Sequence, residues 1–265
     1  MTTIEPGLDY EFLRYIQVTP EGQKKIQSYY LPFFKGCQLV VDLGCGDGDF
    51  VELLEENGIT AIGVDSDPKC CAAAQQRGLN VVCQDVFVYL RGLEAESVDG
   101  IFSAHLVEHL PYEKVLELLR LSKRALRKGG CIVLTTPNVR GLFSHLEMFY
   151  MHFGHVTFYH PKLLCFFLEY TGFSNPVMGE NPNFPSPLWG NLKLTPIRYE
   201  PELPLVKDNP LRRLIKRGKM LLVKLIVQPY LDQLVPQMNE RLAQLKSALD
   251  IVDRPFECYV YATKE

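Results

Sequence analysis

Three aspartates and three glycines crowd one short segment, which reads Val40-Val41-Asp42-Leu43-Gly44-Cys45-Gly46-Asp47-Gly48-Asp49-Phe50. Glycine tolerates a positive φ and lets a ligand approach the backbone closely. An apolar run at 39–43 precedes the glycines, and a helix-forming run at 50–56 follows them. A strand-to-helix turn of this kind directs free backbone N–H groups at a ligand. The segment therefore predicts a site for a nucleotide-like molecule at the C-terminal end of a strand.

The spacing of the glycines, G-x-G-x-G, differs from the dinucleotide fingerprint G-x-G-x-x-G. Asp42, Asp47 and Asp49 surround the turn. Three carboxylates would repel a pyrophosphate, but they suit a ligand with positive charge, such as a sulfonium that carries an α-amino group. A nicotinamide-dependent oxidoreductase is therefore the weaker interpretation.

The turn resembles motif I, D/E-x-G-x-G-x-G, of the class I S-adenosylmethionine-dependent methyltransferases, and the resemblance extends over residues 39–173. In detail it is similar to the branch that contains ubiquinone-biosynthesis O-methyltransferases and methyltransferases of polysaccharide assembly. The resemblance implies S-adenosyl-L-methionine as cofactor and methyl transfer as the reaction.

Cofactor contacts are expected where successive strands end. Asp65 lies 21 positions after Gly44, where a carboxylate can accept both ribose hydroxyls. The resemblance implies that Asp42 lies near the methionyl amine and that Asp85 accepts the adenine amino group, although Asp85 could equally cap a helix. Asp67, before Pro68, is expected to be a helix N-cap instead. The predicted cofactor-binding residues are Asp42, Gly44, Cys45, Gly46, Asp65, Ser66, Asp85, Val86 and His105.

Methyl transfer requires alignment of donor and acceptor and, for a hydroxyl acceptor, a base. His155 is the first candidate for that base, because the run Gly154-His155-Val156-Thr157-Phe158 resembles an H-x-x-F segment of the family. His160, before Pro161, is expected to cap a helix.

Two substrate-binding residues are predicted near the base. His109 follows the fourth strand, where it could instead form a structural pair with Glu108. Asn138 closes the Thr136-Pro137-Asn138 run, which resembles a family turn that shapes the substrate pocket; turn formation alone would also explain it. These segments favour O-methylation of a sugar, polysaccharide or lipid-linked precursor. A quinone-like phenol is the next candidate acceptor, and a non-catalytic cofactor-binding protein is a rival interpretation.

Strands and helices that alternate along the chain must position these residues. Strands are predicted at 39–43, 61–65, 80–83, 98–103 and 131–135, and helices at 49–56, 68–77, 86–91, 112–127 and 161–170. Such alternation predicts an α/β fold with a doubly wound, mostly parallel sheet. Two further strands, 173–178 and 255–262, are expected to pair antiparallel as in the family, which gives a seven-stranded Rossmann-like sheet.

Three regions are predicted: a helical N-terminal cap at 1–38, a methyltransferase core at 39–180 and 255–265, and a mostly helical insertion at 181–254. In the cap, Arg14 and Tyr15 are candidates for closing over the cofactor, or they only pack the cap. In the insertion, the basic stretch 210–228 could lie on an anionic membrane or be an ordinary surface helix. The heptad-like stretch 231–252 could pack on the core or form a homodimer.

Composition and charge argue against several other classes of protein. The net charge of −3 gives no general attraction to nucleic acid, and no apolar run approaches the ~20 residues of a membrane span. The N-terminus lacks a signal-peptide pattern, so we expect a cytoplasmic protein, with membrane association at most at the cytoplasmic face. The eight cysteines form no C-x-x-C and are expected to be free thiols; no metal site is expected.

Overall fold

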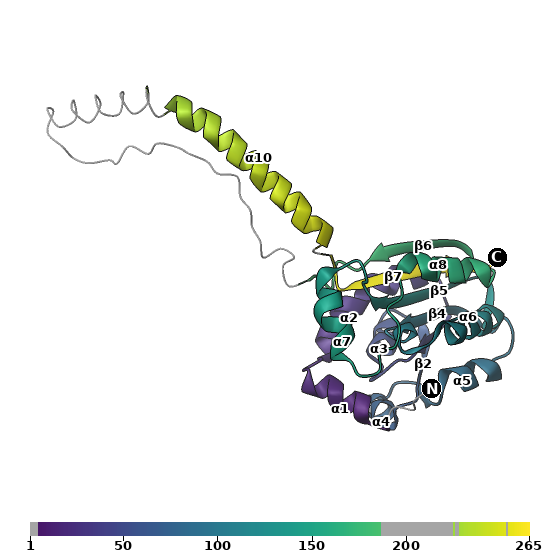
Figure 1. Ribbon diagram of the computed structural model, residues 1–265. Helices are drawn as coiled ribbons and strands as arrows, with labels where there is room; N and C mark the ends of the chain where they lie inside the picture. Colours follow the sequence, from purple (N-terminus) through teal and green to yellow (C-terminus); the bar gives the residue numbers. More distant parts are fainter. Residues whose placement is uncertain (1–4, 187–224, 226–227, 253) are drawn as a thin grey trace. The chain divides into compact units, whose positions relative to one another are not determined.

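A computed structural model describes residues 5–186, 225, 228–252 and 254–265 of the 265-residue chain (Figure 1). The chain divides into two compact units, residues 1–189 with 253–265, and residues 190–252. The first unit contains the sheet and every candidate site residue.

The first unit is built on a seven-stranded sheet in the order β3-β2-β1-β4-β5-β7-β6, in which only β7 runs antiparallel to its neighbours. This order reverses at β1 and β4, so the carboxyl ends of the central strands border a crevice where α/β proteins bind ligands. The strands are β1 Leu39–Leu43, β2 Thr60–Asp65, β3 Val81–Cys83, β4 Val98–Ala104, β5 Leu126–Pro137, β6 Ser174–Glu180 and β7 Glu257–Thr263.

Helices cover both faces of the sheet, each over its own apolar cluster. One cluster packs α5, α6 and α8 on the sheet, and the other packs η1, α3 and α4. The doubly wound Rossmann-like fold is thereby confirmed. The helices of the first unit are α1 Leu8–Tyr15, α2 Pro20–Gln27, η1 Ser28–Phe34, α3 Asp49–Glu56, α4 Pro68–Gln76, α5 Val86–Gly92, η2 Val107–His109, α6 Tyr112–Ala125, η3 Ser144–Met148, α7 Phe149–Met151 and α8 Pro161–Tyr170.

The junction of α6 and β5 differs from the prediction of a helix to residue 127 followed by a strand from 131. The helix ends at Ala125, and Leu126 already pairs with Val98 of β4. Gly129 has φ +77° and donates its N–H to the carbonyl of Lys264. The glycines therefore let the start of β5 bend against the C-terminal strand, where long-range pairing overrides the local helix signal.

The N-terminal region does more than cap the sheet. Tyr30 and Phe34 of η1 are fully buried, and both rings pack on Phe102 of β4. Asn181, the first residue of the predicted 181–254 insertion, belongs to the first unit and donates to the carbonyl of Ile26. The second unit begins at residue 190.

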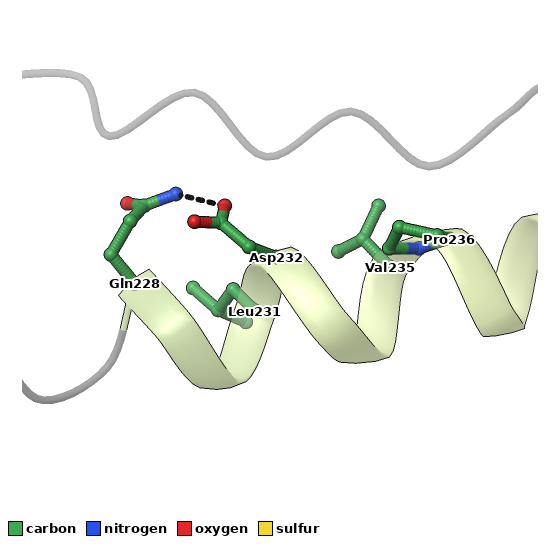
Figure 2. A pocket seen from close by; sticks show the side chains of 5 residues that line it. All are labelled: Gln228, Leu231, Asp232, Val235 and Pro236. Atoms are coloured by element: carbon green, nitrogen blue, oxygen red, sulfur yellow. Dashed lines mark hydrogen bonds between the residues drawn. The ribbon is translucent and has the colours of Figure 1, made fainter.

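In the second unit, the structure describes one long helix, α10 (Gln228–Val252), in which Pro236 lies inside the helix. Figure 2 shows its first turns, where the Gln228 amide donates to Asp232 at 2.8 Å and Leu231 and Val235 lie nearby. Most of the basic stretch 210–228 lies outside the described residues. Within the described ranges, no helix is long and apolar enough to cross a membrane.

A buried polar network joins the sheet to η1 and η2, and we call it the His105 network. Nδ1 of His105 lies 3.0 Å from Oε1 of Glu108, and Nε2 lies 2.8 Å from Oε2 of Glu257. Both carboxylates are buried, whereas the ring keeps 32% of its side-chain surface exposed. The other members donate to these carboxylates: Tyr30, Thr135 and Asn181 to Glu257, and Thr136 to Glu108.

Hydrogen bonding decides the charge of the His105 network. Burial alone would lower the pKa of His105, but hydrogen bonds to Glu108 and Glu257 raise it to about 10. Burial opposes ionisation of both glutamates, yet their bonds to His105 hold each pKa below the ordinary 4.5. The centre of the unit is therefore an imidazolium between two carboxylates.

The His105 network should make stability depend on pH in a defined window. The pKa of His105 is raised from 6.5, so its stabilising effect is full below pH 6.5 and disappears as pH rises toward about 10. The glutamates have lowered pKa values, so their effect disappears as pH falls below 4.5. The variant His105→Asn suits the positive φ of this residue (+51°) and removes the charge.

Urea unfolding of wild type and His105→Asn should show the largest stability difference near pH 5.5 and a smaller one at pH 9. The exposed His145→Asn serves as the control and should show little change at either pH. A wild-type advantage that stays constant between the two pH values would contradict the charged network.

Candidate functional site

The glycine turn after β1 forms a cradle with an open side. Gly44 donates its N–H to the carbonyl of Val64, and Gly46 donates to Oδ2 of Asp65, both at 2.8 Å. A Cβ built on Gly46 would meet nothing within 4 Å, so its backbone faces open space. On Gly48 a Cβ would lie 2.7 Å from Cδ1 of Leu79. The last glycine thus serves packing, whereas Gly46 is bare where a ligand could lie.

Asp42 is buried at the end of β1, and its Oδ1 has no hydrogen-bond partner in the described part of the chain. Burial, followed by the nearby Asp65 and Asp49 charges, raises the pKa of Asp42 well above its ordinary value. A buried acceptor without a donor is costly to keep, and a cationic ligand would satisfy it.

Two of the three acids of the turn pair with arginines of the protein. Asp47 forms an ion pair with Arg14 of α1, and Asp49 bonds to Arg77 at 2.8 Å. Oδ1 of Asp47 is nevertheless buried without a hydrogen-bond partner among the described residues. Arg14, a candidate for closing over the cofactor, holds α1 on the turn through Asp47, whereas Tyr15 is 83% exposed.

Asp65 lies at the end of β2, beside the turn. Its Oδ1 accepts the N–H of Asp67 and its Oδ2 accepts that of Gly46, both at 2.8 Å. Burial raises its pKa, and the two backbone hydrogen bonds oppose that rise. These two hydrogen bonds hold the carboxylate of Asp65 in place. Its spacing from Gly44 predicts that this carboxylate binds the ribose hydroxyls.

The remaining predicted cofactor residues lie around the same edge. Asp67 caps α4 through the N–H groups of Lys69 and Cys70, as expected. Asp85 caps α5, with Oδ1 accepting two backbone N–H groups, so the alternative role as a cap is confirmed and the adenine contact remains a prediction. Val86 and Cys45 are buried, and Ser66 is exposed.

His105 is predicted to touch the cofactor. Both of its ring nitrogens are bonded to Glu108 and Glu257, so only its backbone and the exposed ring surface could make that contact. The neighbouring Leu106 approaches the turn closely, because a Cβ on Gly44 would lie 3.5 Å from its Cδ1.

The structure brings the predicted base His155 and the predicted substrate residue His109 together. Their ring centroids are 4.9 Å apart, and His152 lies 4.9 Å from each of them. His152 is not among the predicted site residues, although the His152-x-x-His155 spacing is a signal for it. We call these three residues the histidine cluster. Besides Glu108, the acid near this cluster is Asp9 of α1, whose Oδ1 lies 3.2 Å from Nε2 of His152.

The predicted base His155 is held in place by its neighbours. Its Nδ1 donates to the carbonyl of Phe149 at 2.7 Å, and its Nε2 lies 3.8 Å from Oε1 of Glu108. Burial lowers the pKa of His155 to about 4, against the opposing charge of Glu108. The ring is therefore neutral at pH 7 and keeps a lone pair on Nε2, but it binds a proton weakly.

The side chain of Asn138 is buried and hydrogen-bonded within the protein, which corrects its predicted contact with substrate. The residue is buried, its amide donates to Pro255 and Glu180, and its Oδ1 accepts the N–H of Arg140. Turn formation, the alternative, explains it. His160 caps α8 by accepting the N–H of Lys162, as expected.

These residues fit the cofactor that the resemblance implies. Gly46 leaves room beside the backbone, Asp42 offers an unpartnered oxygen for an amine, and Asp65 offers a fixed carboxylate for hydroxyls. All three lie at the carboxyl ends of β1 and β2, which are paired in parallel.

Comparison with known proteins agrees with this geometry. Residues 41–134 match a family described as "Methyltransferase domain". Trans-aconitate 2-methyltransferase from Rhizobium rhizogenes is 33% identical over 112 residues, which cover 41% of this chain and 42% of that protein. Ubiquinone biosynthesis O-methyltransferase from Coxiella burnetii is 30% identical over 105 residues, 37% of this chain and 43% of that protein. The match thus spans less than half of these relatives.

Solved structures extend the similarity over nearly the whole chain. A SAM dependent methyltransferase from Archaeoglobus fulgidus has a TM-score of 0.72 and 29% identity, covering 97% of this chain and 100% of that one. Phosphoethanolamine N-methyltransferase 2 from Haemonchus contortus, with 18% identity and a TM-score of 0.52 over 96% of this chain and 59% of that one, shares the fold. The chain therefore shares the fold of these S-adenosylmethionine-dependent methyltransferases, and its residues 41–134 match a methyltransferase domain.

Proposed function

We propose that this protein transfers the methyl group of S-adenosylmethionine to an oxygen atom of a small or lipid-linked acceptor. The observation that carries the proposal is the open glycine turn, with Gly46 bare, Asp42 lacking a partner and Asp65 held by two backbone N–H groups. Such a site offers an acceptor to a positively charged amine and another to vicinal hydroxyls.

When bound, the cofactor supplies a methyl group on a positively charged sulfur, which is a good leaving group. An acceptor oxygen forms the new C–O bond as the S–C bond breaks, and the electron pair of that bond passes to sulfur. The chain's own task is to hold both molecules in line and to remove the hydroxyl proton. His155 is the candidate for proton removal, because its Nε2 is unprotonated at neutral pH.

The acceptor class is the open part of this proposal. We rank a glycan hydroxyl first, on the resemblance of the Gly154–Phe158 region, and a quinone-like phenol second, supported by the similarity to the ubiquinone biosynthesis O-methyltransferase. The Thr136-Pro137-Asn138 run no longer favours a sugar, since Asn138 serves the turn. Nucleic acid is not among the proposed substrates.

We further propose two partners for the second unit. Residues 210–228 could contact an anionic membrane surface, and residues 231–252 could pair with a second copy of the chain. In support of pairing, α10 exposes Leu234, Met238 and Leu245.

The decisive assay incubates the protein with labelled S-adenosylmethionine and a panel of glycan precursors, quinone-like phenols and amines. Methyl transfer to a hydroxyl acceptor supports the proposal. Transfer to amines but never to hydroxyls would contradict the oxygen assignment. Cofactor binding with no transfer to any acceptor would favour the rival, a non-catalytic cofactor-binding protein.

The glycine turn predicts a specific loss of cofactor binding. Gly46 and Gly58 both have positive φ and open space where a Cβ would lie, but only Gly46 lies in the turn. Gly46→Ala and Gly58→Ala should therefore lose similar stability, about 1 kcal/mol each. Calorimetric titration with S-adenosylmethionine should show at least tenfold weaker binding for Gly46→Ala and for Asp65→Ala, and unchanged binding for Gly58→Ala. Equal affinities for both glycine variants would exclude the turn as the site.

Removing the charge of Asp42 should raise the stability of the protein and weaken its binding of S-adenosylmethionine. Its raised pKa means that the ionised carboxylate opposes folding once pH rises above about 4, where the unfolded chain ionises freely. Asp42→Asn keeps the shape without the charge, so the cofactor-free protein should melt at a higher temperature. Its affinity for S-adenosylmethionine should fall, as measured by the same titration. A variant that melts lower and binds normally would show that the charge of Asp42 serves the fold alone.

If His155 is the base, its removal should lower turnover without weakening cofactor binding. His155→Ala should lower kcat about 100-fold or more, the usual contribution of a positioned base, and leave the cofactor Kd unchanged. His160→Ala, in the same run of sequence, removes a helix cap and should keep kcat. Full turnover by His155→Ala would end its assignment as the base.

A further inference from the structure

The histidine cluster has the geometry of a metal site that the sequence did not suggest. One ligand nitrogen each from His109, His152 and His155 lies within 4.8 Å of the others. His109 ends η2, and the other two histidines follow α7 within a few residues. The sequence separates His109 from His152 by more than forty residues, so only the fold brings them together.

The hydrogen bonds around the cluster orient two of the rings. A carbonyl can only accept, so Nδ1 of His155 donates to Phe149 and its Nε2 carries the lone pair. The N–H of Gly154 donates to Nδ1 of His152 at 3.1 Å, so an ion that takes this lone pair would replace the Gly154 hydrogen bond. Nε2 of His152 lies 3.2 Å from Oδ1 of Asp9 without forming a hydrogen bond. Metal-binding histidines characteristically donate their second nitrogen to a carbonyl or a carboxylate, as His155 does to Phe149.

His109 supplies the third nitrogen. Its Nδ1 is buried against the backbone of Gly154 and has no hydrogen-bond partner among residues 5–186 and the other described positions. A buried polar atom without a partner reduces stability, and an ion bound to it would remove that penalty.

We propose that His109, His152 and His155 bind a divalent transition-metal ion of the zinc type and leave one coordination position open. Three imidazoles favour such an ion over magnesium or calcium, which prefer oxygen ligands. On a tetrahedral ion with bonds of about 2.0 Å the nitrogens lie about 3.3 Å apart, so the rings close in on binding. The carboxylates of Glu108 and Asp9, near His155 and His152, supply compensating negative charge.

The open position gives the ion a role that rests on the proposed function. An acceptor hydroxyl bound there would release its proton to solvent water more readily, because a bound cation stabilises the oxyanion. With the ion bound, His155 would be a ligand, so its proposed role as base applies to the ion-free protein. The binding of the ion itself does not depend on this role.

The test is titration of the chelator-treated full-length protein with Co²⁺, a zinc substitute whose visible absorption reports tetrahedral nitrogen coordination, followed by displacement with Zn²⁺. We expect one Co²⁺ per chain. His152→Gln and His155→Gln should weaken binding at least about 100-fold, because each removes a direct ligand. His145→Gln, an exposed histidine from the same region, should bind as wild type does.

A further variant reaches the cluster without removing a ligand. In Gly154→Ala the added methyl would lie 2.7 Å from Nδ1 of His109, so Co²⁺ binding should weaken there too. Folding of each variant is checked by circular dichroism, and S-adenosylmethionine titration of the same samples tests the proposed function separately. A folded wild-type protein that takes up no Co²⁺, or binding that survives both His→Gln variants, would overturn the metal site even if methyl transfer is observed.

Discussion

The imidazolium of His105 between two buried carboxylates is the interaction on which the first unit depends. Glu108 comes from η2 and Glu257 from β7, and each also accepts a hydroxyl from β5. A buried carboxylate without its partner is strongly destabilising. The positions of η2, β5 and β7 therefore depend on one another. The network therefore fixes the end of β4, and with it Leu106 beside the glycine turn and His109 in the histidine cluster.

The short helix α1 connects the two halves of the site. Its Arg14 pairs with Asp47 in the glycine turn, and its Asp9 lies beside His152 in the histidine cluster. Phe12 of the same helix packs edge-on against His152, with ring centroids 5.0 Å apart. None of the residues of α1 is buried, so the helix is held mainly by these polar and aromatic contacts. One element with little apolar anchoring therefore contacts both the glycine turn and the histidine cluster.

Local signals predicted the sheet, the strand-to-helix turn and the helix caps, because apolar periodicity, glycine and Asx or histidine caps act over a few residues. The predicted β1 and α3 coincide with the observed elements, and Asp67 and His160 cap as expected. Contacts between residues that are far apart in the sequence could not be predicted from these local signals. The pairing of Asp49 with Arg77, the saturation of Asn138 and the grouping of His109 with His152 all depend on how loops meet after folding. Residue type alone marked Asn138 and His109 as candidate site residues, and tertiary contacts decided what each side chain meets.

The order of the strands has a consequence for synthesis on the ribosome. Strand β7 lies between β5 and β6 in the sheet, yet it follows the second unit in the sequence. Until it emerges, β6 has no neighbour in the described sheet and Glu108 must neutralise His105 without Glu257. The nascent sheet therefore exposes one edge of β5 while residues 181–256 are being translated. Such an edge can pair with other chains, so a chaperone or rapid shielding during that interval would favour correct folding.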